Sequence, residues 1–255
     1  MSQRNVVFVS FADSVFQRSK QRISFEAAQS GLFNKVMVAG PELFDKDFCH
    51  CTGNLMIEKR GFGYWVWKPW IILKTLSLMN ENDILWYCDA GCHLNINDES
   101  KKRFLSYIDK LVDGKHVFCF PLSYPNQNCF HSNGDWCKYD LLKYFGLELD
   151  EEFQNSVQLS ATTIGFRKCQ QSIEIVQRWF DTSCMKHLID DSFVINSKIH
   201  RPTFKEHRHD MSILNCVLWK NGKEGTFVAD SDETWFDNKW HEDGKTFPIW
   251  ATRLR

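Results

Sequence analysis

An unbroken apolar run, Ile84 to Cys88, stands between two aspartates in this chain. Its composition predicts a buried strand, and the acid that follows the strand, Asp89, precedes the small residues Ala90 and Gly91. Open α/β sheets build ligand sites where a strand ends and the next loop opens outward. The run therefore predicts an α/β fold with a nucleotide or metal site at this strand end.

Strands and helices alternate along the whole chain, which favours a layered α/β architecture. Gly31 is a natural helix end, and Pro69 suits a first helical turn because its missing N–H would be unpaired there anyway. The predicted fold class is one Rossmann-like domain, residues 1–255, with a mixed, mostly parallel central sheet flanked by helices. Strands are expected at 6–10, 34–39, 84–88, 116–121, 158–166 and 226–229. Helices are expected at 19–30, 69–79, 100–112, 170–182 and 210–219.

Composition and charge disfavour several classes of function. The net charge of −1 offers no basic field for nucleic acid. No apolar run approaches the roughly 20 residues that cross a bilayer, so no transmembrane segment is expected. The ten cysteines lie mostly in apolar stretches, and no secretion signal is evident, which favours reduced thiols and a cytoplasmic protein.

The block Arg60-Gly-Phe-Gly-Tyr-Trp-Val-Trp-Lys-Pro-Trp70 has the features of a diphosphate site. Its glycines allow a close backbone approach, Lys68 supplies a cation, and the helix that starts at Pro69 supplies free N–H groups. In the alternative interpretation, the tryptophans pack beneath the sheet and the lysine reaches water.

Three further positions carry candidate chemistry. Asp89 can coordinate a hard divalent cation or accept a hydrogen bond from a ribose hydroxyl, or it can simply cap a turn. Asp210 stands at the N-cap of a predicted helix, beside His209, which adds proton-transfer capacity. In the tail, His241 is a candidate metal ligand and Lys245 a candidate phosphate contact, with a solvated turn as the alternative.

In their order along the chain, these motifs resemble those of GT-A glycosyltransferases. Tyr87-Cys-Asp-Ala-Gly91 stands where that fold has a short acidic motif, with Gly91 in place of the second acid. Asp210-Met-Ser-Ile-Leu-Asn215 and the stretch 241–250 are similar to motifs of the glycogenin and lipopolysaccharide-galactosyltransferase family. The glycine and tryptophan block resembles more closely that of bacterial and large-virus glycosyltransferases that build surface polysaccharides.

The resemblance implies transfer of a hexosyl unit from a nucleoside diphosphate sugar, most simply a UDP-sugar, to a hydroxyl of a glycan acceptor. It implies a divalent metal, Mn²⁺ or Mg²⁺, held by Asp89 and His241. Residues 1–120 would mainly bind the donor and residues 121–255 the acceptor. The candidate bases are Asp190, Asp191 and Asp210. The candidate nucleotide-sugar contacts are Ser10, Arg60, Gly63, Tyr64, Trp67, Lys68, Asp89, Ala90, Gly91, His209 and Lys245.

Several alternatives remain open at this level. A metal-dependent nucleotidyltransferase or hydrolase would also use an acid at a strand end, but no P-loop or dense carboxylate pair is present. A glycan-binding protein without catalytic activity would use the tryptophans alone. The segment 123–136 is expected to be a long functional loop whose aromatic residues could make peripheral contact with a membrane. The sequence does not choose between inversion and retention of configuration. It does not indicate the oligomeric state either.

Overall fold

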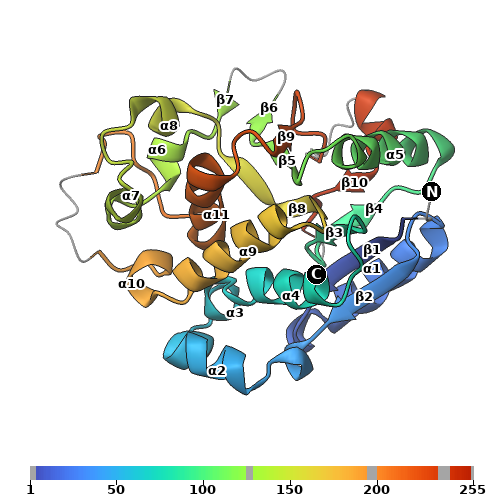
Figure 1. Cartoon of the computed structure of the whole chain (residues 1–255), viewed down its shortest axis with the longest axis horizontal. Helices are drawn as coiled ribbons and strands as arrows, with labels where there is room; N and C mark the ends of the chain where they lie inside the picture. The colour runs from blue at the N-terminus through green and yellow to red at the C-terminus, as the bar shows by residue number, and fades with distance from the viewer. Residues whose placement is uncertain (1–3, 125–128, 194–199, 235–241, 254–255) are drawn as a thin grey trace.

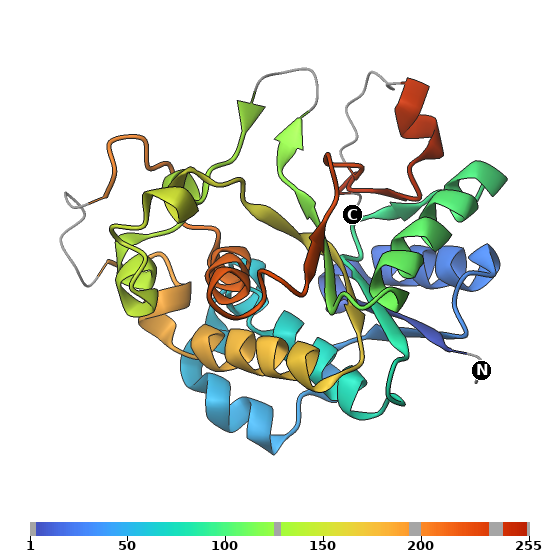
Figure 2. The same ribbon diagram turned by 45° about the horizontal axis from the view of Figure 1, so that its top comes forward.

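A six-stranded sheet runs through the molecule, with helices packed on both of its faces (Figures 1 and 2). The structure is a computed structural model, and it describes residues 4–124, 129–193, 200–234 and 242–253. The strand order is β2-β1-β3-β8-β5-β9. The strands are β1 (Val6–Phe11), β2 (Lys35–Ala39), β3 (Ile84–Cys88), β5 (Val117–Pro121), β8 (Leu159–Arg167) and β9 (Thr226–Val228).

The sheet is mixed and mostly parallel, as the sequence predicted. Strand β1 pairs in parallel with both β2 and β3, and β5 pairs in parallel with β9. Strand β8 is antiparallel to both of its neighbours, β3 and β5. All five residues of β3 are buried, in agreement with the unbroken apolar run from which the strand was predicted.

Two hydrophobic clusters cover the two faces of the sheet, because successive side chains of a strand point to opposite sides. Val7 and Val9 of β1 belong to the first cluster, with residues of α4 (Trp67–Ser77), α9 (Gln170–Ser183) and α11 (His209–Asn221). Phe8 belongs to the second, with residues of α1 (Gln17–Ser30) and α5 (Asp98–Val112). The predicted helices therefore form the two outer layers of the predicted α/β fold.

The chain reverses its direction of winding between β1 and β3. It leaves β1 through α1 to β2 on one side, and then returns through α4 to β3 on the other side of β1. Because α1 and α4 lie on opposite faces, a crevice is expected outside the carboxyl ends of β1 and β3. Asp89, which directly follows β3, lies at this switch point.

The segment 123–136 is not the loop that the sequence predicted. It contains the hairpin strands β6 (Ser123–Tyr124) and β7 (Cys129–Phe130) and the short helix α6 (Asn133–Trp136). Elements this short contain too few residues to show a period in the sequence. The same reason accounts for other short helices that were not predicted, which are α2 (Lys46–Thr52), α3 (Gly61–Tyr64), α7 (Tyr139–Phe145), α8 (Glu151–Asn155) and α10 (Lys186–Ile189). The remaining elements are η1 (Ser14–Phe16), η2 (Pro41–Leu43), η3 (Gly53–Ile57), η5 (Glu242–Thr246), β4 (His93–Leu94) and β10 (Ile249–Trp250).

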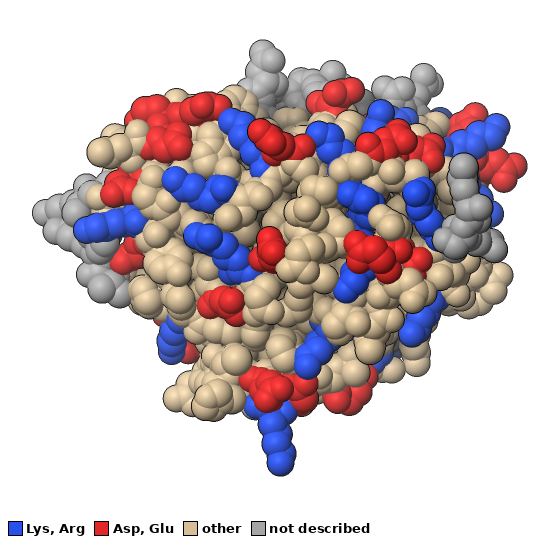
Figure 3. Space-filling model, viewed as in Figure 1, with Lys and Arg blue, Asp and Glu red and all other residues tan. Residues whose placement is uncertain are grey.

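The surface carries charges of both signs. Basic and acidic side chains are interspersed over the face shown in Figure 3, and neither sign forms a continuous field there. In the described part of the chain, no helix combines the length and the apolar character that a membrane crossing requires.

Gly165 offers a test of the central packing. A Cβ atom added at this position of β8 would lie 2.7 Å from a ring carbon of Trp86 and 2.9 Å from Cδ1 of Leu111. We expect Gly165→Ala to lower the free energy of unfolding by about 1–3 kcal/mol, because the surrounding core has no room to move. Urea unfolding followed by tryptophan fluorescence measures this change.

Gly244→Ala is the matched control, since a Cβ atom at Gly244 would meet no heavy atom within 4 Å. Its free energy of unfolding should stay within about 0.5 kcal/mol of the parent value. Equal unfolding midpoints for the two variants would contradict the packing described for β8.

Candidate active site

The chain enters α4 through a left-handed turn. Every residue from Gly61 to Trp65 has a positive φ, with values of 58°, 51°, 86°, 54° and 62° in order. Residues other than glycine lose about 1–2 kcal/mol each in this conformation, so the two glycines reduce the strain. The indole N–H of Trp67 donates to the carbonyl of Gly61 at 3.0 Å and closes the turn. The turn brings Lys68 into the first turn of α4.

Lys68 is the centre of a buried ion cluster. Its Nζ lies 3.2 Å from Oδ1 of Asp89 and 3.2 Å from Oδ2 of Asp210, and donates to the carbonyl of Ala161 at 3.0 Å. The side chain of Lys68 is only 4% exposed. An ammonium has three N–H donors, and three acceptors surround this one. The predicted diphosphate contact of Lys68 would therefore require one of these partners to be displaced.

Burial and charge act in opposite directions on this cluster. Burial favours the neutral form of Lys68, but Asp210 and Asp89 outweigh it and raise the pKa of the lysine. Burial raises the pKa of Asp210 to about 6, although Lys68 acts to lower it. The ion pair of 3.2 Å with Lys68 is the contact of Asp210 Oδ2 within the described residues.

Asp89 is the member of the cluster that reaches solvent. Its side chain is 31% exposed, and its Oδ1 accepts a hydrogen bond of 2.6 Å from the hydroxyl of Tyr87. Its Oδ2 has no hydrogen-bond partner among the described residues, which leaves an acceptor for a ligand. Tyr87 was not among the predicted site residues. Its position two residues before Asp89 on the same strand places both side chains on one face, and this period would have identified it.

The loop after Asp89 is held from two sides. Nη2 of Arg22 donates to the carbonyl of Ala90 at 2.8 Å, and the hydroxyl of Thr252 donates to the carbonyl of Gly91 at 3.1 Å. Nη1 of Arg22 is buried without a hydrogen-bond partner in the described structure, and so is the hydroxyl of Ser10 near the end of β1. Buried polar groups are rarely left unpaired, so these two groups are exceptions among the described residues.

A second polar group lies on the other side of the left-handed turn. Oδ1 of Asp191 is 3.2 Å from the guanidinium of Arg60 and 3.0 Å from Nε2 of His209. The His209 ring stacks on Tyr64 with centroids 5.1 Å apart. Burial lowers the pKa of His209 against the opposing effect of Asp191. Four predicted site residues, two of them from the block 60–70, are thus brought together here.

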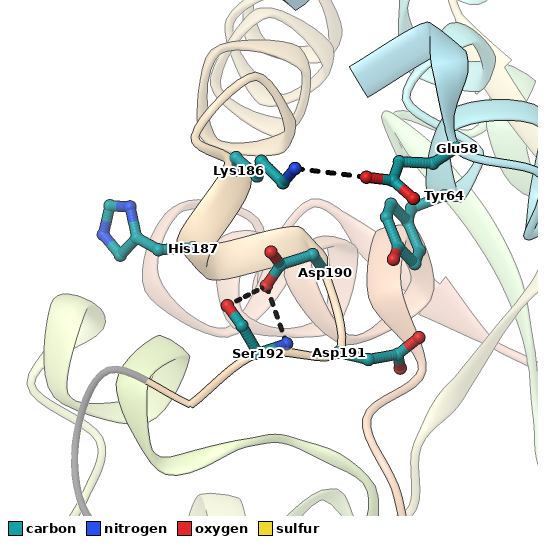
Figure 4. Close-up of a pocket in the computed structure, with 7 residues that line it drawn as sticks. All are labelled: Glu58, Tyr64, Lys186, His187, Asp190, Asp191 and Ser192. Carbon is teal, nitrogen blue, oxygen red and sulfur yellow. Dashed lines mark hydrogen bonds and ion pairs between the residues drawn. The ribbon is translucent and has the colours of Figure 1, made fainter. Parts of the chain in front are cut away.

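A pocket of about 590 Å³ opens beside this group (Figure 4). Asp190 and Asp191, two of the predicted bases, contribute to its lining together with Tyr64. The carboxylate of Asp190 is tied to Nζ of Lys138 at 3.1 Å and to the hydroxyl of Ser192 at 2.6 Å. Lys138 and Ser192 were not predicted, because no local pattern marks a lysine or serine that contacts a distant carboxylate.

The predicted site residues in the later part of the chain include Asp210, Lys245 and His241. Helix α11 begins at His209 with Arg208 at the N-cap, so the prediction that Asp210 is the N-cap residue was wrong. The cause is the ion pair with Lys68, which draws the Asp210 side chain into the cluster. Lys245 lies in η5, exposed, and its carbonyl accepts from Asn95 beside the start of α5. His241 lies outside the described residues.

The described residues do not fit a divalent cation. Within the described ranges, no group of three or more His, Cys, Asp or Glu side chains is placed to hold a metal ion. Asp89, one of the predicted ligands, already contacts the ammonium of Lys68 and the hydroxyl of Tyr87 through Oδ1. Mg²⁺ and Mn²⁺ favour several oxygen ligands, and a neighbouring ammonium opposes them.

Solved structures similar to this chain include three with glycosyltransferase names. Mouse xyloside xylosyltransferase 1 is 10% identical over 98% of this chain and 98% of its own, with a TM-score of 0.48. The bifunctional glycosyltransferase WbbM is 10% identical over 98% of this chain and 46% of its own, with a TM-score of 0.45. An active-site mutant of the galactosyltransferase LgtC is 11% identical over 98% of this chain and 84% of its own, with a TM-score of 0.43.

The names of these three structures are those of glycosyltransferases, and each TM-score is below 0.5. Similarity at this level concerns the course of the backbone and does not extend to a donor or an acceptor. No protein-family model matches the sequence, and no curated protein sequence is significantly similar to it.

The cluster predicts a pH dependence of stability. The pKa of Asp210 is about 6 in the folded chain and near 3.8 for an ordinary aspartate. The folded state therefore binds this proton more tightly, so the contribution of Asp210 to the free energy of unfolding falls as pH rises from about 4 to 6. Asp210→Asn removes this titration and should flatten the profile by at most about 3 kcal/mol. Urea unfolding at a series of pH values between about 4 and 7 measures the effect.

Asp109→Asn is the control, because Asp109 is an exposed aspartate of α5 with no side-chain contact to the described residues. Its profile should follow that of the parent chain. An Asp210→Asn profile with the same slope as the parent's would contradict the assignment.

Proposed function

We propose that this chain transfers a hexosyl unit from a nucleoside diphosphate sugar, a UDP-sugar by the resemblance of its motifs, to a hydroxyl of a glycan. The observation that carries the proposal is the partly exposed carboxylate of Asp89, fixed by Tyr87 and Lys68 at the switch point between β1 and β3. Nucleotide ligands of open α/β sheets bind in this crevice. The free Oδ2 of Asp89 is suited to accept a hydrogen bond from a donor hydroxyl.

The diphosphate leaving group needs donors that face the same crevice. Arg22 and Ser10 supply two unsatisfied buried groups there, and a guanidinium is a strong partner for phosphate oxygens. Lys68 acts through Asp89 in this scheme, because its own donors are surrounded by acceptors. Fixed donors of this kind stabilise the negative charge that develops as the glycosidic bond breaks.

The acceptor hydroxyl loses its proton during transfer. Among the three predicted bases, Asp210 is buried against Lys68, and Asp190 is tied to the buried Lys138. Asp191 is 46% exposed and contacts His209 and an equally exposed Arg60. We therefore assign the base of an inverting reaction to Asp191. A retaining reaction can proceed through the geometry of the bound donor without a separate base. In that case Asp191 would be an acceptor-binding residue.

A donor screen tests the proposal. The protein is incubated with a panel of nucleotide sugars, and release of the nucleoside diphosphate is followed without metal and with Mn²⁺ or Mg²⁺. The metal arms test the predicted pair of Asp89 and His241. Turnover of unrelated phosphoesters with no nucleotide sugar consumed would favour a hydrolase, and glycan binding without any turnover would favour a binding protein.

Asp89→Asn should lower turnover of the preferred donor about 100-fold or more, because it removes the charge that faces the crevice. Steady-state release of nucleoside diphosphate measures the loss. Asp109→Asn, the exposed aspartate of α5, is the matched control and should retain the parent rate. If Asp89→Asn stays folded and keeps the parent rate, the crevice is not the donor site.

A further inference from the structure

The pocket beside the left-handed turn is built from segments far apart in the sequence. Glu58 comes from the chain after η3, Tyr64 from α3, Lys186 and His187 from α10, and Asp190 to Ser192 from the turn that follows α10. Figure 4 shows the Lys186 and Glu58 side chains meeting across one side of the pocket, while the His187 ring turns away from the others. The volume of about 590 Å³ is large enough for a small ligand.

Every acid that lines the pocket is paired with a base. Glu58 is 3.1 Å from Lys186, and Asp191 is 3.2 Å from Arg60. Asp190 is 3.1 Å from Lys138, whose side chain is 0% exposed and lies behind the pocket wall. Each of these carboxylates contacts a cation, and Arg60 is shared with Glu206 at 3.4 Å, so the pairs leave no excess of positive charge at the pocket wall. An anionic ligand would find no cation free of its partner among them, and a metal ion would have to displace one.

Tyr64 contributes a polar group that these pairs leave unused. The residue is 8% exposed, and its hydroxyl makes no hydrogen bond to a described residue. In Figure 4 the phenol oxygen points toward the side of the pocket that Asp190 and Asp191 form. Burial, with help from Glu58 and Asp191, raises the pKa of Tyr64, so the hydroxyl keeps its proton at neutral pH. A hydroxyl aimed into a pocket without a protein partner is free to form a hydrogen bond with a ligand there.

We propose that this pocket binds a neutral sugar unit of the acceptor, through hydrogen bonds from its hydroxyls to the paired carboxylates and to Tyr64. Sugar hydroxyls both donate and accept, and the pocket offers fixed acceptors in its carboxylates and donors in Tyr64 and Lys186. As an assignment of the acceptor subsite, the proposal rests on the glycosyltransferase function proposed above.

The location agrees with this role. Tyr64 stacks on His209, and His209 directly precedes Asp210 of the Lys68 cluster. One layer of side chains therefore separates the pocket from the cluster that fixes Asp89. Lys138 holds the far wall, since its Nζ donates to the carbonyls of Asp190 and Ser192 at 2.7 Å and 3.0 Å. An acceptor in the pocket would lie next to the donor crevice with its position fixed.

Direct binding tests the pocket without any requirement for turnover. Saturation-transfer NMR on the intact chain with galactose, glucose, xylose, lactose and maltose should detect a neutral sugar. Glucose 6-phosphate should bind more weakly than glucose. Absence of a signal from every neutral sugar, or stronger binding of the phosphate, would overturn the proposal.

Lys186→Met removes one charged donor from the pocket and should weaken binding of the preferred neutral sugar about tenfold, with a matching rise in its KM as acceptor. Tyr64→Phe should weaken binding by a smaller factor, because it removes one neutral hydrogen bond. Lys223→Met breaks a surface ion pair elsewhere, that of Lys223 with Glu152, and is the matched control that should bind like the parent chain.

The outcomes separate the two proposals. If the parent chain binds a neutral sugar, Lys186→Met weakens that binding and no nucleotide sugar is consumed, the pocket stands and the transferase function fails. If a nucleotide sugar is consumed and the acceptor KM is unchanged in both pocket variants, the transferase function stands and the pocket is not the acceptor subsite.

Discussion

The ammonium of Lys68 is the contact on which the site depends. It joins the start of α4, the end of β3, the first turn of α11 and the backbone of β8, because its partners are Asp89, Asp210 and Ala161. A buried charge is tolerated only when it is paired, and removal of one partner leaves an uncompensated charge behind. The cluster therefore fixes how these elements meet at the carboxyl end of the sheet, and with them the direction of the Asp89 side chain.

The strained backbone lies at the same place. Tyr64 and His209 both have a positive φ, and their rings stack on each other, so two left-handed segments meet in one contact. A strained backbone conformation persists only where the surrounding contacts hold it in place. Such conformations concentrate at functional sites. Here the ion pairs of Lys68 with Asp210 and of Asp191 with His209 hold the backbone in this conformation.

Some of this arrangement could be predicted from the sequence. The strand β3 and the acid after it follow from an apolar run with clear ends, and helices longer than about ten residues show their period. The short helices that carry Tyr64 and Lys186 could not be predicted, because four residues hold no period. Neither could the pairing of Lys138 with Asp190, since it depends on how α7 and the turn after α10 approach each other.

The Lys68 cluster and the pocket differ in charge. Because of this difference, we expect them to bind different ligands. Two carboxylates share one ammonium in the cluster, so Asp89 presents an excess of negative charge toward hydroxyls, while Arg22 and Ser10 keep unsatisfied groups at the same crevice. In the pocket each lining carboxylate contacts a cation, and Arg60 is shared between Asp191 and Glu206. A nucleotide sugar carries both hydroxyls and charged phosphates, whereas a neutral glycan carries hydroxyls alone. The two environments are neighbours, because Tyr64 lines the pocket and stacks on His209, which directly precedes Asp210 of the cluster.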